Sequence, residues 1–133
     1  MKILRTVLAM ALVTAGLFSC KKDSITEPSQ PATTFEGKWT GHYDYGDNGQ
    51  KYYFCLNFKS GGVIEEYSSS GKLLGSGTWK MDANKIITAE WVWPSSNKKY
   101  FIVAAYYPGD KQILGDWGYA KNAVDGGTFE LVK

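Results

Sequence analysis

Residues that could carry catalysis are few in this chain of 133 residues. His42 is the single histidine, so a Ser/His/Asp arrangement has one candidate base, and His42 with the thiol of Cys55 falls short of a usual zinc site. Glu65 and Glu66 are adjacent, so on a strand they point to opposite faces and cannot act together as an acid/base pair. We therefore predict no catalytic residues, no metal site and no cofactor.

Aromatic side chains are abundant instead, with five tryptophans and nine tyrosines, all of them after residue 34. Trp91 and Trp93 are two residues apart, so they share one face of a strand close to its end, beside a turn at 94–97. Such rings combine an apolar face with a polar tip, which suits stacking against a sugar or a flat aromatic ligand. This pair is therefore our leading candidate for a binding site.

The elements that must position these rings show an alternation of side chains with a period of two from residue 35 onward. Residues typical of turns interrupt this pattern about every dozen residues. The pattern predicts eight short strands, at residues 35–45, 51–59, 63–68, 73–81, 85–93, 99–107, 112–120 and 127–133. Short connections favour antiparallel neighbours in sequence order. We predict an all-β, eight-stranded antiparallel up-and-down meander barrel, since closure removes exposed sheet edges. A two-sheet sandwich is the alternative.

The first predicted strand begins with Gly37-Lys38-Trp39, which resembles the G-x-W signature of the calycins, the lipocalin and avidin group of eight-stranded barrels. The resemblance covers residues 35–133 and implies that Trp39 plugs one barrel end. The final strand, which begins with Gly127-Thr128-Phe129, is similar to that of small bacterial lipocalin-like lipoproteins. Because a small barrel needs large side chains to fill it, we expect structural roles for Trp39, Trp79 and Trp117. We expect a structural role for Gly37 as well, because barrel corners need the sharp bends that glycine permits.

The N-terminus resembles the export signal of bacterial lipoproteins. Two basic residues precede an apolar run at 6–18, which is shorter than the roughly 20 apolar residues needed to cross a bilayer. Leu17-Phe18-Ser19-Cys20 resembles a lipobox, which implies cleavage before Cys20 and its acylation. We expect a signal peptide at 1–19, a lipidated flexible tether at 20–34 and the β-barrel domain at 35–133, held in the cell envelope at the outer membrane, on its periplasmic or surface face.

Charge and cysteine content narrow the partners further. Loss of the two N-terminal basic residues takes the formal net charge from +2 to zero, and Lys98-Lys99, expected at a solvated hairpin tip, is the only adjacent basic pair after residue 34. This pattern gives no electrostatic surface for nucleic acid. A lipidated Cys20 leaves Cys55 without a partner within the chain, so we expect a buried thiol. The expected partner is the membrane, and the oligomeric state stays open.

We expect a non-enzymatic, lipid-anchored protein that binds a small apolar or aromatic ligand, or a glycan, at an aromatic barrel mouth. Successive hairpins alternate ends, so one rim collects the predicted ligand-binding residues Tyr43, Tyr45, Tyr52, Trp91, Trp93 and Tyr100. One alternative is a protein-interaction or enzyme-inhibitor lipoprotein with a filled barrel. Another is a hydrolase built on distant carboxylates such as Asp44 and Glu90. A cavity favours binding, and a filled barrel with an exposed apolar patch favours protein interaction.

Overall fold

The computed structural model describes residues 34–46, 49–119 and 124–133. The predicted signal peptide, Cys20 and the tether up to residue 33 lie outside these residues. A single 3-10 turn, η1 (Ser60–Gly62), joins β2 to β3. In the described segments no helix is long and apolar enough to cross a membrane. The strands are β1 (Gly37–Tyr43), β2 (Tyr52–Lys59), β3 (Val63–Tyr67), β4 (Leu73–Met81), β5 (Ile86–Trp93), β6 (Lys98–Tyr107), β7 (Gln112–Gly118) and β8 (Gly127–Val132).

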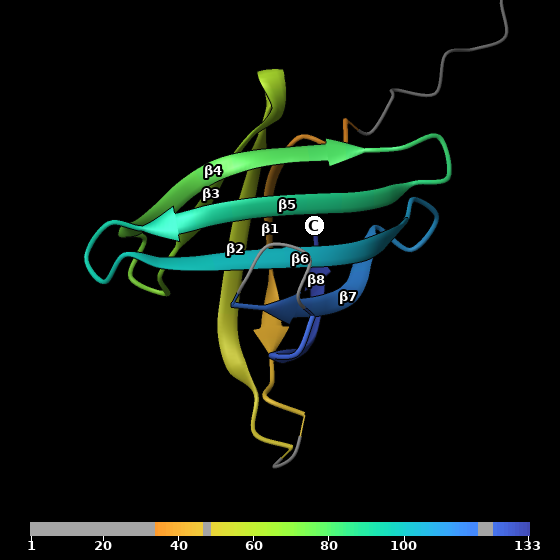
Figure 1. Ribbon diagram of the computed structural model, residues 1–133. Coiled ribbons are helices and arrows are strands. Elements are labelled where there is room, and N and C mark those ends of the chain that lie inside the picture. The colour runs from red at the N-terminus through yellow and green to blue at the C-terminus, as the bar shows by residue number, and fades with distance from the viewer. Residues whose placement is uncertain (1–33, 47–48, 120–123) are drawn as a thin grey trace, which may run out of the picture. The chain divides into compact units, whose positions relative to one another are not determined.

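The eight strands form a closed barrel in which each strand pairs with its neighbours in sequence order. Closure comes from the antiparallel pairing of β1 with β8, in register from Thr40 opposite Val132 to Tyr43 opposite Phe129. Figure 1 shows β4, β5 and β6 running across the front, with β1, β2 and β8 behind them in a steeply different direction. The predicted meander barrel is confirmed and the sandwich alternative is wrong. This architecture is compatible with a lipocalin-like fold.

Alternation along each strand divides the barrel interior from its surface. On β2, Phe54, Leu56 and Phe58 are buried, while Tyr53 and Lys59 on the opposite face are exposed. The first predicted strand was too long at both ends, for local reasons. Gly37 has a φ of 119°, a left-handed backbone angle that suits glycine, and past Tyr43 the carboxylate of Asp44 accepts the backbone N–H of Gly46 and turns the chain.

One end of the barrel is sealed by aromatic rings. Trp39 is fully buried, and its indole Nε1–H donates to the carbonyl of Phe35 at 2.8 Å. The Phe35 ring packs on Trp39 at a centroid distance of 5.5 Å, and Tyr106 meets Trp39 edge-on at 5.6 Å. Lys133 fastens the entering chain by donating to the carbonyls of residues 34–36, with its ammonium 5.3 Å from the Trp39 ring centroid. We refer to this region as the closed end.

Candidate ligand site at the open end of the barrel

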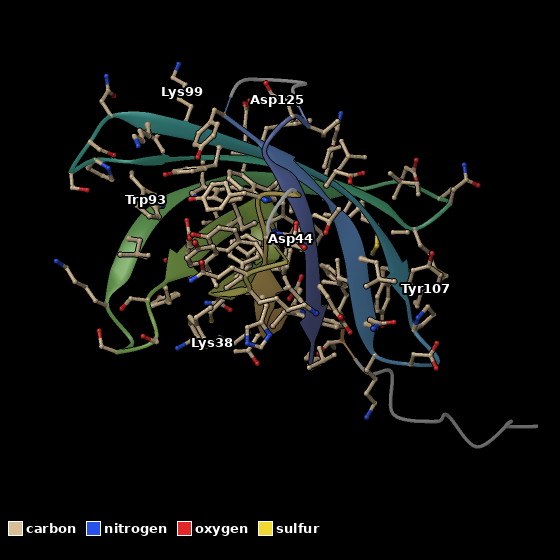
Figure 2. All side chains as sticks on the ribbon, turned by 90° about the horizontal axis from the view of Figure 1, so that it is seen from below. Lys38, Asp44, Trp93, Lys99, Tyr107 and Asp125 are labelled. Carbon is tan, nitrogen blue, oxygen red and sulfur yellow. The ribbon has the colours of Figure 1, made fainter. Side chains whose placement is uncertain are left out.

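A cavity of about 170 Å³ lies at the other end of the barrel, which we call the open end. Along β6, Tyr100 lines this cavity, whereas Tyr106 near the other end of the same strand packs against Trp39. In Figure 2, side chains crowd the space enclosed by the curved strands, and Lys99 points away from it. The cavity is lined by Tyr43, Tyr45, Phe54, Glu66, Trp91, Trp93, Lys98, Tyr100, Trp117 and Tyr119.

The structure brings together most of the predicted binding residues. Five of the six, namely Tyr43, Tyr45, Trp91, Trp93 and Tyr100, line the cavity. The sixth, Tyr52, is one ring away, stacked on Tyr43 at a centroid distance of 5.3 Å. The predicted mouth is therefore a real hollow, and Tyr52 supports its wall rather than lining it.

The residues expected to be structural divide between the two ends. Trp39 and Trp79 belong to the closed end, where the Trp79 indole donates to the carbonyl of Lys59 at 2.9 Å. Trp117 is buried but lines the cavity, so it belongs to the open end. Its Nε1–H donates to the backbone carbonyl of Asp44 at 2.9 Å, which ties β7 to the segment after β1.

Glu66 is the residue that sequence reasoning missed. It is 7% exposed, and it is the one buried polar or charged side chain in the part of the chain that the structure describes. The indole Nε1–H groups of Trp91 and Trp93 both donate to its Oε2, at 2.6 Å and 2.5 Å. A signal was present, because alternation from the apolar Ile64 places Glu66 on the inner face. From sequence, the adjacent position of Glu65 and Glu66 excludes a catalytic pair but does not assign a role to Glu66.

Glycines on β4 allow two tryptophans of β5 to reach a glutamate on β3. Gly75 stands in register with Glu66, and Gly77 stands in register with Trp91. A Cβ on Gly75 would lie 2.3 Å from the carbonyl oxygen of Val92 and 2.8 Å from Cδ1 of Trp93. Only glycine leaves this space between the strands, so Gly75 is part of how the site is built.

Ring contacts hold the cavity walls in place. Tyr100 stacks on Trp91 with centroids 5.7 Å apart and planes 21° apart, and it lies 5.0 Å from Trp93. Tyr43 meets Trp117 edge-on at 5.3 Å, and Trp117 lies 6.5 Å from Tyr100. Tyr45 also meets Trp117 edge-on, at 5.3 Å, and at 42% exposure it forms part of the rim. Such aromatic pairs add stabilisation beyond area burial, so the cavity walls are preorganised.

Burial sets the electrostatics of the site. Burial raises the pKa of the Glu66 carboxyl, and the hydrogen bonds from Trp93 and Trp91 oppose that rise by stabilising the charged form. Burial, with the nearby Glu66 charge, raises the pKa of Tyr100 to about 12. Burial also raises the pKa of Tyr43. These two phenols are therefore neutral at pH 7, while Glu66 is the acidic group of the cavity.

Other residues considered for chemistry lie elsewhere. The carboxylate of Asp44 accepts hydrogen bonds from the backbone N–H and the hydroxyl of Thr128, and these bonds lower the pKa of Asp44. Glu90 stands in the middle of β5, opposite Thr78. Asp44 and Glu90 therefore share no site. Cys55 is a buried free thiol. Lys98, expected in a turn, begins β6 opposite Trp93 and lies exposed at the cavity rim. Within the described ranges no group of three or more His, Cys, Asp or Glu residues could hold a metal ion.

Comparisons with known proteins return no relative: the chain matches no protein-family model, no curated protein and no solved structure. The function proposed for the open end is accordingly argued from its geometry.

Proposed function

We propose that this protein is a non-enzymatic binding protein that holds one small ligand in the cavity at the open end. The observation that carries the proposal is the cavity itself, with mainly aromatic walls and a volume of about 170 Å³. An apolar cavity of about 150 Å³ is known to hold benzene. A ligand of roughly six to eight non-hydrogen atoms is therefore the right size, which favours a compact aromatic or branched alkyl group over a glycan chain.

Native mass spectrometry of the full-length protein, purified from its own host, tests this proposal. The expected result is a co-purified ligand of about 100 Da bound at one copy per chain. Trp93→Phe removes an indole N–H donor from the cavity while keeping an aromatic ring, and it should weaken retention of the ligand. Trp79→Phe is the matched control, because Trp79 belongs to the closed end. Equal retention in both variants would show that the ligand binds elsewhere.

We also propose that the domain works at the surface of the outer membrane, attached through lipid on Cys20 and belonging to the lipocalin-like lipoproteins. The support is the lipobox Leu17-Phe18-Ser19-Cys20 after a short apolar run. Three acyl chains on one cysteine, at about 0.8 kcal/mol per buried CH₂, would make the attachment effectively permanent. A clickable palmitate analogue should label the wild-type protein in its host. Persistence of the label in Cys20→Ala would contradict the anchor.

A further inference from the structure

The cavity contains a buried acid that has no cationic partner within the described residues. Glu66 is 7% exposed, and the one ion pair among residues 34–46, 49–119 and 124–133 joins Lys59 to Glu65 on the barrel surface. A buried carboxylate without an opposite charge destabilises a fold unless something else compensates. Both indole hydrogen bonds end on Oε2, so the carboxylate is oriented but its charge is not neutralised.

We propose that the cavity takes a small organic cation, an alkylammonium group, paired with the Glu66 carboxylate and surrounded by the rings of Trp91, Trp93, Tyr100 and Tyr43. This inference rests on the proposed function, because it names the ligand class for the same cavity. A cation supplies the missing opposite charge without adding a covalent or catalytic step.

The aromatic walls favour a cation for an independent reason. The face of an aromatic ring carries partial negative charge, so a cation near several faces is attracted, most strongly when it is shielded from water. Trp91 and Tyr100 are stacked and both line the cavity, and Tyr43 and Trp117, which meet edge-on, line it as well. Aromatic cages of this composition are suited to quaternary ammonium groups, and an alkylammonium of six to eight non-hydrogen atoms agrees with the cavity size of roughly benzene dimensions.

Two other occupants can be separated from a cation by chemistry. A neutral ligand with an acceptor oxygen would require protonated Glu66. Burial raises the Glu66 pKa and so favours protonation, but the two N–H donors on Oε2 oppose this, and a bound cation would add to them in favouring the ionised form. An anion would require Lys98 as its partner, but Lys98 is exposed at the rim and its charge is screened by water and salt. Glu66 is the buried charge, so it dominates inside the cavity.

Calorimetric titration of the full-length protein in a non-ionic detergent tests the charge preference with three probes of similar size and shape. They are choline, its uncharged carbon analogue dimethylbutanol, and the anionic analogue dimethylbutanoate. Choline should bind about tenfold more tightly than the neutral probe, and the anion should bind least. If the neutral or anionic probe binds as tightly, the cation inference is overturned while the cavity remains a binding site. If no probe binds, the inference is overturned and native mass spectrometry decides the proposed function separately.

Substitution of adjacent acids locates the effect. Glu66→Gln keeps the shape and an acceptor oxygen for the indoles, and it should lower choline affinity about tenfold. Glu65→Gln changes the neighbouring acid on the outer face, where Glu65 binds Lys59 and Tyr67, and should leave choline affinity unchanged. Equal loss in the two variants, or no loss in Glu66→Gln, would overturn the inference.

The pH dependence of the wild-type protein tests the same point should Glu66→Gln fail to fold. Choline affinity should rise with pH as Glu66 loses its proton, because the cation pairs with the charged form. The phenol pKa values of Tyr43, Tyr100 and Tyr119 are raised by burial, so these groups stay neutral from about pH 4 to 8. A flat affinity profile over this range would overturn the inference. The other titratable groups that line the cavity with Glu66 are Tyr43, Tyr45, Lys98, Tyr100 and Tyr119.

Discussion

The two ends of this barrel use the same side chains for different purposes. At the closed end, the indoles of Trp39 and Trp79 donate to the backbone carbonyls of Phe35 and Lys59. At the open end, the indoles of Trp91 and Trp93 donate to one buried carboxylate. The closed end thereby satisfies the backbone and stabilises the fold, while the open end orients a charge that the fold itself does not need.

The difference shows how to distinguish a tryptophan that fills a core from one that builds a site. Ring burial does not distinguish them, because Trp39 and Trp91 are both buried. Trp117 lines the cavity but donates to the backbone carbonyl of Asp44, so it holds the wall of the site. The acceptor of the indole N–H does separate Trp39 from Trp91, since the buried carboxylate that Trp91 binds has no ion partner and is a local conflict with stability. Such conflicts are concentrated at functional sites.

The largest expected effect is at the closed end. Trp39→Ala should lower the free energy of unfolding by roughly 3 to 5 kcal/mol, because it removes a fully buried ring that packs on Phe35 and Tyr106. Chemical denaturation measures this change. A loss below about 1 kcal/mol would mean that Trp39 does not seal the barrel.

A smaller effect is expected from the space beside Trp93. Gly75→Ala should lower the free energy of unfolding by about 1 to 3 kcal/mol, because the added Cβ meets the backbone of Val92 and the Trp93 ring. Gly109→Ala is the control, since a Cβ there has no neighbour within 4 Å. Thermal or chemical melts that rank the two variants equally would contradict the close packing across β4.

The adjacent acids should give opposite dependences of stability on pH. Burial raises the folded pKa of Glu66, so its stabilising contribution is present below its unfolded pKa and is lost as pH rises through the folded pKa. The hydrogen bond from Tyr67 lowers the folded pKa of Glu65, so its contribution is present above the unfolded pKa and is lost as pH falls through the folded value. Relative to the wild type, Glu66→Gln should therefore gain stability with rising pH.

Denaturation of the wild type, Glu66→Gln and Glu65→Gln at a series of pH values measures these slopes. As pH falls, Glu65→Gln should gain stability relative to the wild type. The same sign of slope for both variants would show that the two carboxylates do not differ in environment as described.

The smallest effect is expected from the surface ion pair. Lys59→Met removes the partner of Glu65 at 3.2 Å, but the Lys59 side chain is 50% exposed, so the free energy of unfolding should change by no more than about 1 kcal/mol. Chemical denaturation at low and high salt checks this value. A loss of unfolding free energy as large as that of Trp39→Ala would contradict the prediction that the surface ion pair stabilises the fold less than the closed end does.

The barrel was predictable because strand alternation and turn residues are local signals. Phe54, Leu56 and Phe58 recur with a period of two, and short connections make sequential strands neighbours. The aromatic rim was predictable for the same reason, since hairpins alternate ends. Local signals of this kind place a residue on a face but do not say what it touches.

The chemistry of the open end depends on pairing across distant segments. Glu66 is 25 and 27 residues from the tryptophans that bind it, and β4 separates them in the sheet. Alternation places Glu66 inside, but the register shift between Glu66 and Tyr67 and the space beside Gly75 decide which rings reach it. Strand alternation places Tyr52 at the rim, but its ring stacks on Tyr43 instead of lining the cavity. A periodic sequence pattern does not reveal a ring contact of this kind.

The most direct test of the contrast between the two ends is nuclear magnetic resonance of the five indole N–H groups during titration with choline. Single Trp→Phe substitutions assign the signals. We expect the Trp91 and Trp93 signals to move with choline concentration, because both donate to Glu66, and the Trp39 and Trp79 signals to stay in place, because both donate to backbone at the closed end. Movement of Trp39 and Trp79 as large as that of Trp91 and Trp93, or no movement of any indole signal, would contradict this account.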